Sequence, residues 1–305
     1  MKSKESSKKN SYRFVDIETL MLVKTYDLRA KIIVESFIGG LHRNSLYGFS
    51  SRFKEYKPYV GGDDLRHLDW KLFARSDRYY IRRYEGETNM QCHILLDLSQ
   101  SMEFDNVGWS KADYACTLSA TLAYFIHGQR DSFGLFSFDE DLLEYLPARL
   151  KQGHLNHFLA ALEHRGGAQQ SQISTVLKKC VEVVNQRGFM VIVSDMMMEL
   201  DELEVHLGYL RAVGHEVLLF QVLDPFELDF DKEESSLFED VESGKTMFVT
   251  PALVRENYQK KLEVHNNKIK FICETHGIHY QLLRTDEPLA SALGNFLRIR
   301  NRIKQ

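Results

Sequence analysis

The sequence predicts an α/β fold with a doubly wound, mostly parallel sheet, and two observations carry that prediction. Short apolar runs typical of buried strands alternate along the chain with longer segments whose apolar residues recur at helical spacing. Strands that alternate with helices form parallel sheets with right-handed crossovers and helices on both faces. The 305 residues, 44% apolar and 27% charged, are ordinary for a soluble globular protein and suffice for a large core.

The chain is expected to begin with a mobile polar tail, residues 1–13, which is rich in Lys and Ser and has no apolar segment behind it. Residues 14–38 then have apolar side chains at helical spacing, with a break near Thr25. Gly39 and Gly40 are expected to end this helix. The sequence thus predicts an N-terminal helix packed against the main core.

Residues 41–90 differ in composition from the rest of the chain. They have few aliphatic side chains, many aromatic and Arg side chains, and a turn signal at Pro58. Residues 79–85 alternate in the manner of a strand. We therefore expect residues 14–87 to form a helix and an irregular segment, and residues 88–305 to form the main α/β domain.

Within the main domain, the periodicity of apolar residues predicts strands and helices in alternation. The predicted strands are residues 94–96, 131–138, 142–146, 189–193, 216–223 and 278–283. The predicted helices are residues 110–128, 154–164, 171–186, 201–213, 251–274 and 287–300. Residues 233–250 are predicted to form an acidic β-hairpin that turns at Ser243 and Gly244.

Three polar residues spaced two apart, Asp97, Ser99 and Ser101, follow the first strand of this domain. Alternating positions place one carboxylate and two hydroxyls on one side of the loop. Such a set of hard oxygens suits Mg²⁺ or Mn²⁺ and suits zinc or copper poorly. Open α/β sheets bind ligands at this edge, the carboxyl ends of their strands. A loop with an Asp or Ser helix cap gives the same pattern, so the pattern alone leaves both interpretations open.

A second carboxylate strengthens the interpretation as a metal site. The predicted strand 189–193 is followed directly by Ser194 and Asp195. If this strand neighbours the one that precedes Asp97, both carboxylates lie at the same edge of the sheet. Asp195 is therefore a further candidate ligand.

This arrangement resembles the metal-ion-dependent adhesion site (MIDAS) of the von Willebrand factor A domain. In that family, Asp-x-Ser-x-Ser follows the first strand, a Thr comes from a later loop and an Asp follows a further strand. The later loop here has Gly166 and Gly167 but no Thr after them. Ser171 stands in the place of the Thr after three inserted residues and keeps the hydroxyl, although it can equally be the N-cap of its helix.

A more specific resemblance lies in residues 48–89. They are similar to the signature of a bacterial family of von Willebrand A-like proteins called domain of unknown function 58, with Lys57 in place of the usual Arg. The matching residues are Gly48, Phe53, Glu55, Tyr56, Pro58, Tyr59, Gly62, Asp63, Asp64, Arg66, Asp69, Trp70, Ala74, Arg75 and 85–89. The resemblance continues to residues 224–227 and 285–288, and it implies a von Willebrand factor A-like fold.

The function that this resemblance implies is a non-catalytic, divalent-cation-dependent protein-binding module. The implied ligands of Mg²⁺ or Mn²⁺ are Asp97, Ser99, Ser101, Ser171 and Asp195. In adhesion sites of this type, a Glu or Asp of a partner protein completes the coordination of the cation. The association of the family with MoxR-type AAA+ ATPases implies such a partner, for which the chain would be an adaptor or chaperone-like protein.

Three alternatives stay open at this point. In one of them the site holds no metal and the fold binds partners by shape alone. A phosphoester hydrolase could use the same metal, and Asp195 is the acid or base that the sequence offers for it. A nucleic-acid-binding module could use residues 41–84, where ten Lys and Arg residues outnumber five acids. The interspersed acids favour ion pairs with the main domain instead.

Composition and segment lengths predict a cytoplasmic protein. No apolar run approaches the roughly 20 residues that span a bilayer. The four cysteines are far apart and form no C-x-x-C pair, which is typical of buried free thiols in a reducing compartment.

Overall fold

The fold is described from a computed structural model of the chain. It describes residues 15–42, 53–60, 69, 72–73, 78–84, 91–139, 142–164, 173–184, 186–198, 200–230, 236–239, 246–249 and 251–303. The tail predicted for residues 1–13 lies outside these ranges, and the division at residues 87 and 88 stays a prediction.

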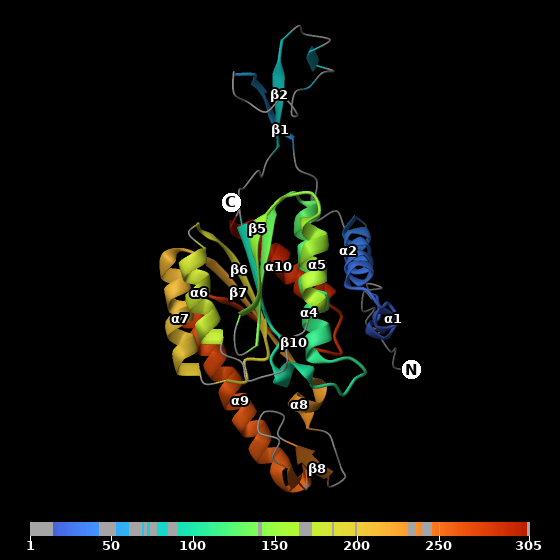
Figure 1. Ribbon diagram of the computed structural model, residues 1–305, viewed down its shortest axis with the longest axis vertical. Coiled ribbons are helices and arrows are strands. Elements are labelled where there is room, and N and C mark those ends of the chain that lie inside the picture. The colour runs from blue at the N-terminus through green and yellow to red at the C-terminus, as the bar shows by residue number, and fades with distance from the viewer. Residues whose placement is uncertain are drawn as a thin grey trace, which may run out of the picture.

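A six-stranded sheet forms the centre of the molecule (Figure 1). In spatial order its strands are β10 (His279–Arg284), β7 (Glu216–Leu223), β6 (Gly188–Ser194), β3 (Gln91–Asp97), β4 (Ser132–Phe138) and β5 (Leu142–Arg149). The first five pair in parallel, and β5 pairs antiparallel with β4 at one edge. The prediction of a mostly parallel sheet in an α/β fold is therefore confirmed.

Helices cover both faces of this sheet, because alternate residues of each strand point to opposite sides. In β3, Ile94 and Leu96 belong to one core and Leu95 to the other. The first core is closed by α4 (Lys111–Gly128), α5 (His154–Glu163) and α10 (Ala290–Ile303), with α1 (Ile17–Met21) and α2 (Tyr26–His42) packed outside. The second is closed by α6 (Ile173–Val183), α7 (Leu200–Val213) and α9 (Pro251–Thr275).

The N-terminal helix differs from its prediction at one end. The break near Thr25 is present between α1 and α2, but α2 does not stop at Gly39 and Gly40 and continues to His42. The packing of α2 against α4 and of Phe37 against Gly294 of α10 stabilises α2 as a whole. Tertiary packing thus outweighs the low helix propensity of glycine.

Short elements complete the fold. In the segment expected to be irregular, β2 (Tyr80–Tyr84) confirms the strand predicted for residues 79–85. It pairs antiparallel with β1 (Phe53–Pro58), which was not predicted. The predicted acidic hairpin is present as β8 (Ser236–Glu239) and β9 (Thr246–Val249), and its turn lies outside the described residues. The helix α8 (Pro225–Asp229) follows β7 and was not predicted.

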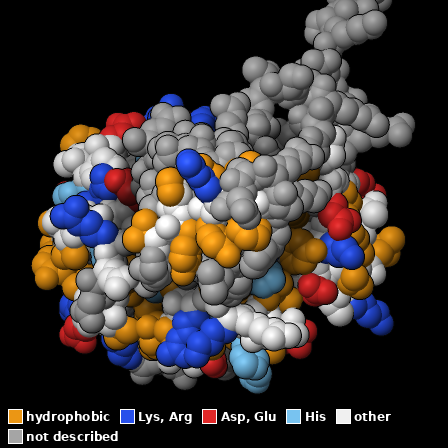
Figure 2. Space-filling model, turned by 90° about the horizontal axis from the view of Figure 1, so that it is seen from above, with side chains coloured by type: hydrophobic (Ala, Val, Ile, Leu, Met, Phe, Trp, Pro, Cys, Tyr) orange, Lys and Arg blue, Asp and Glu red, His pale blue; other side chains and the backbone are white. Residues whose placement is uncertain are grey.

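The two ends of the sheet have different surroundings. The carboxyl ends of the parallel strands point toward α8, at the lower end of Figure 1. Figure 2 looks onto the opposite end, where hydrophobic, basic and acidic side chains are interspersed. The side chains of Arg82 and Arg83, on which the nucleic-acid alternative depends, are not among those described. In the described part of the chain, no helix is both long and apolar enough to cross a membrane.

Candidate metal centre

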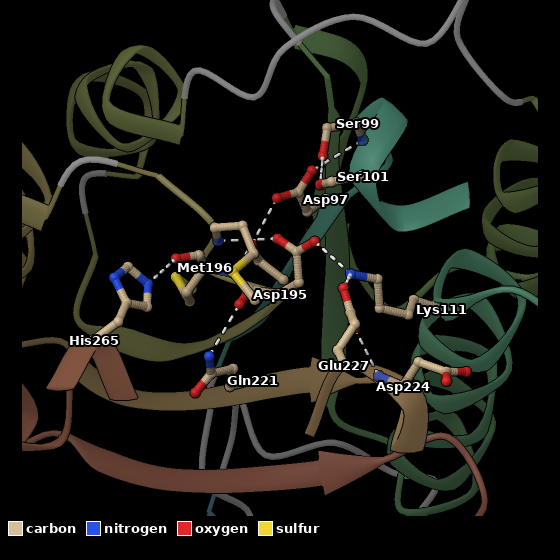
Figure 3. Close-up of polar contacts among 12 residues, drawn as sticks. Asp97, Ser99, Ser101, Lys111, Asp195, Met196, Gln221, Asp224, Glu227 and His265 are labelled. Carbon is tan, nitrogen blue, oxygen red and sulfur yellow. Dashed lines mark hydrogen bonds and ion pairs between the residues drawn. The ribbon is translucent and has the colours of Figure 1, made fainter. Parts of the chain in front are cut away.

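Two buried carboxylates leave the sheet from neighbouring strands. Leu96 of β3 pairs with Val193 of β6, so the residues that follow them, Asp97 and Ser194, emerge side by side. The Ser194 hydroxyl donates to Asp97 Oδ2 at 2.6 Å, and the amide of Ser99 donates to Asp97 Oδ1 at 3.0 Å. Adjacent parallel strands therefore set the position of the Asp97 carboxylate, and these two bonds set its orientation (Figure 3).

Two hydroxyls flank this carboxylate. Ser99 precedes the short 3₁₀-helix η2 (Gln100–Glu103), but its hydroxyl makes no capping bond to that helix. It lies instead 3.2 Å from the hydroxyl oxygen of Ser101. The alternative interpretation of the motif, a serine cap, does not hold for Ser99.

Asp195 lies in the loop that follows β6, and several bonds hold that loop. Its Oδ1 accepts from the amide of Met197 at 3.1 Å. Met196 has a φ of 58°, in the left-handed region of backbone conformation. This conformation is unfavourable for residues other than glycine. The loop keeps this conformation because Gln221 Nε2 donates to the Asp195 carbonyl at 3.0 Å and His265 Nε2 lies 2.8 Å from the Met196 carbonyl.

A lysine lies between Asp195 and a third carboxylate. Lys111 Nζ is 2.8 Å from Asp195 Oδ2 and 2.6 Å from Glu227 Oε1, and its side chain is fully buried. Burial disfavours the ammonium ion, but the two carboxylates outweigh it and raise the pKa of Lys111 to about 12. Lys111 is therefore a permanent cation within the site.

The helix α8 presents Glu227 to this lysine. Asp224 caps α8 by accepting from the Phe226 amide at 2.8 Å, and Glu227 Oε2 accepts in return from the Asp224 amide at 2.8 Å. This reciprocal pair is a capping box, and it fixes the side chain of Glu227. Burial raises the pKa of Glu227, while Lys111 opposes that shift.

The surroundings of Asp97 disfavour its negative charge. Burial, followed by the negative charge of Asp195, raises the pKa of Asp97 to about 6, although bonds from Ser194 and Ser99 oppose the shift. A bound cation beside Asp97 would favour its ionised form.

The donor set fits a small hard cation. Ligands about 2.1 Å from Mg²⁺ lie about 3 Å apart along an edge of the octahedron. The hydroxyls of Ser99 and Ser101, 3.2 Å apart, have nearly that separation. Within the described ranges, no three His, Cys, Asp or Glu side chains form a metal cluster. A cation here would therefore depend on the serine hydroxyls as well as on Asp97 and Asp195.

The structure brings together four of the five residues expected at the site. Asp97, Ser99, Ser101 and Asp195 lie at one edge of the sheet, and Ser171 lies outside the described residues. Sequence reasoning did not identify Ser194, Lys111 or Glu227. A signal for Lys111 was available, because a lysine in the first turn of a helix opposes the helix dipole and needs another reason to be there.

The comparisons with known proteins identify a family and related chains. A family model described as "Protein of unknown function DUF58" matches residues 55–268. The uncharacterized protein Rv1480 of Mycobacterium tuberculosis is 24% identical over 287 residues, covering 92% of this chain and 89% of that protein. The uncharacterized protein MAV169 of Mycobacterium avium is 26% identical over 134 residues, covering 44% of this chain and 78% of that protein.

Two solved structures from Bacteroides are similar over part of the chain. One is an aerotolerance-related membrane protein from Bacteroides fragilis, with 16% identity and a TM-score of 0.47, covering 68% of this chain and 97% of that one. The other is the conserved hypothetical protein BatB from Bacteroides thetaiotaomicron, with 15% identity and a TM-score of 0.47, covering 68% and 99%.

Proposed function

The chain belongs to the DUF58 family of proteins of unknown function, and on that premise we propose that it is a divalent-cation-dependent protein-binding module without catalysis of its own. Its fold would then be of the von Willebrand factor A type, which the MIDAS-like motif implies. The observation that carries the proposal is the convergence of Asp97, Ser99, Ser101 and Asp195 at the ends of two neighbouring strands.

The charges of the site support a single divalent cation. Asp97, Asp195 and Glu227 carry three negative charges when ionised, and Lys111 carries one positive charge, which leaves two negative charges. Mg²⁺ or Mn²⁺ would supply the matching charge and coordination positions for an acidic side chain of a partner protein. Asp97 and the two serines would hold the cation, and Asp195 would support it from the loop after the neighbouring strand β6.

Asp195 is poorly placed to be the general acid or base of a hydrolase. Its Oδ1 accepts from the Met197 amide and its Oδ2 from the Lys111 ammonium, so its oxygens already accept hydrogen bonds from the protein. A catalytic base must reach the proton that it removes, directly or through one water. This geometry favours the binding function over hydrolysis.

The proposed partner is a protein that presents a Glu or Asp side chain, and the family resemblance makes a MoxR-type AAA+ ATPase of the cytoplasm the specific candidate. The four cysteines are all buried and form no disulfide, which is compatible with a reducing compartment. The chain would act as an adaptor or chaperone-like component for that ATPase.

An affinity pull-down from a lysate of the source cells tests this function. Wild type is compared in Mg²⁺ and in EDTA with Asp97→Ala, and with Asp201→Ala, which removes an exposed carboxylate on α7 and serves as the control. We expect Mg²⁺-dependent capture of an AAA+ ATPase by wild type and by Asp201→Ala, and loss of capture by Asp97→Ala. The same captured proteins under all conditions would refute the proposal.

A further inference from the structure

Lys111 occupies a position that helix energetics disfavour. It is the first residue of α4, directly after the N-cap Ser110, whose hydroxyl accepts from the Asp113 amide at 3.1 Å. The positive end of the helix dipole lies there and repels a cation. Burial adds the cost of removing an ammonium ion from water. The ion pairs with Asp195 and Glu227 offset these costs, so the place of Lys111 depends on both carboxylates.

The ammonium connects three separate elements. Lys111 comes from α4, Asp195 from the loop after β6, and Glu227 from α8 (Figure 3). Glu227 is held by the capping box with Asp224, and Asp224 Oδ2 accepts in turn from the hydroxyl of Thr285 at 3.1 Å. Lys111 therefore contacts a carboxylate whose position α8 sets, as well as a carboxylate of the candidate metal centre.

The ion pair with Lys111 changes how much negative charge the site offers to a cation. Asp195 Oδ2 points at Lys111, so the ammonium offsets the charge that Asp195 would contribute. Lys111 pairs with Asp195 and Glu227, whereas Asp97 accepts from the amide of Ser99 and lies on the side of the two serines. Asp97, Asp195, Glu227 and Lys111 together balance a divalent cation, but two of these carboxylates are directed at Lys111. A cation held mainly by one carboxylate and two neutral hydroxyls therefore keeps positive charge locally, where a partner would bind.

We propose that Lys111 is a positioning residue that withholds the charge of Asp195 from the cation, and so leaves positive charge for an acidic side chain of the partner. This inference rests on the proposed function. It explains how one site can favour binding of a partner protein over tight binding of the cation alone. It assigns opposite effects to Lys111: the residue weakens binding of the cation alone, and it strengthens the binding of a carboxylate to the cation-loaded site.

The test measures both effects on the intact chain. Mn²⁺ affinity is determined from the electron paramagnetic resonance signal of the free ion, with and without acetate as the carboxylate probe. Because binding free energies are reciprocal, tighter binding of Mn²⁺ in acetate, after correction for Mn²⁺–acetate association in buffer, reports binding of acetate to the loaded site.

The main variant is Lys111→Met/Glu227→Gln. It removes one positive and one negative charge, so the four side chains keep the same net charge, and it avoids leaving Glu227 buried without its lysine. The single variant Lys111→Met is also measured if its near-ultraviolet circular dichroism spectrum shows native packing. The control is Lys260→Met, which removes a lysine from the exposed ion pair with Glu256 on α9.

We expect the double variant to bind Mn²⁺ roughly tenfold more tightly than wild type. The net charge is unchanged, but the lost cation contacts Asp195 directly, whereas the lost carboxylate of Glu227 lies on the other side of that lysine. We expect acetate to improve Mn²⁺ binding less in the double variant than in wild type, and Lys260→Met to match wild type. Equal or weaker Mn²⁺ binding by the natively packed double variant would overturn the inference while the proposed function stands. An acetate effect as large as that of wild type would overturn it as well.

The same data separate the two proposals. If wild type binds no Mn²⁺ but the double variant does, Lys111 controls the charge of the site and the proposed function is refuted. If neither chain binds Mn²⁺, both proposals are refuted.

Discussion

Removing the charge of Asp97 is expected to stabilise the cation-free protein. The side chain is fully buried, and its pKa rises from the ordinary value of 3.8 to about 6 because of burial and of the nearby Asp195. A shift of this size corresponds to about 3 kcal/mol by which folding disfavours the ionised form. Asp97→Asn has no charge to bury, and its carbonyl oxygen can still accept from the Ser99 amide.

The size of the effect depends on pH in a defined direction. The folded-state pKa lies above the ordinary value, so the folded chain binds the proton more tightly than the unfolded chain does. Wild type therefore loses stability as pH rises from about 4 to about 6, and it carries the full cost above that range. At pH 7.5 in EDTA we expect the free energy of unfolding of Asp97→Asn to exceed that of wild type by about 1–3 kcal/mol. The gain can fall below the full value of about 3 kcal/mol because the amide replaces the protonated acid imperfectly beside Ser194. The difference should shrink as pH falls.

Urea denaturation in EDTA measures this free energy of unfolding directly. Addition of Mg²⁺ at pH 7.5 should then stabilise wild type and leave Asp97→Asn unchanged, because a ligand that binds the folded state stabilises it by mass action. A variant that is less stable than wild type in EDTA at pH 7.5 would refute the reasoning. So would a difference between the two chains that grows as pH falls.

Three further predictions concern other parts of the molecule. Ser99→Ala and Ser101→Ala should each weaken Mn²⁺ binding about tenfold in calorimetry, since each removes one hard-oxygen ligand. A natively packed variant that binds Mn²⁺ as tightly as wild type would exclude the deleted hydroxyl as a ligand. Arg130→Gly should raise the free energy of unfolding by about 1 kcal/mol, because Arg130 has a φ of 60° where α4 ends in a Schellman motif; an unchanged or lower melting temperature would contradict this. The four buried thiols should resist alkylation in the native chain and all react in urea, because burial raises the pKa of Cys92 and of Cys273 to about 12; rapid labelling of the native chain would show that the cores open readily.

Much of the fold follows from local sequence patterns. Apolar runs and helical periodicity predict the strands and helices of the main domain, because each buries a face against the same two cores. Gly39 and Gly40 show the limit of such reasoning, since the packing of α2 decides where that helix ends. The helix α8 spans five residues and is too short for periodicity, although the pair Asp224 and Glu227 is a capping-box pattern.

The candidate site could be predicted in part for a similar reason. Asp97 and Asp195 each follow an apolar strand, so their edge of the sheet is predictable, but the adjacency of β3 and β6 is a long-range property. Lys111 was not identified because its partners Asp195 and Glu227 are 84 and 116 residues away in the chain. The place of Lys111 in the first turn of a helix is a local signal, but no local spacing shows which residues it contacts.

The most direct test of the central claim is a crystal of the intact chain grown with Mn²⁺ and measured for anomalous scattering. The account predicts a single strong peak within bonding distance of an Asp97 carboxylate oxygen and of the hydroxyls of Ser99 and Ser101, with Lys111 still bound to Glu227. An anomalous difference map without a peak at that edge of the sheet would contradict it, provided that Asp97 and the two serines have well-defined electron density.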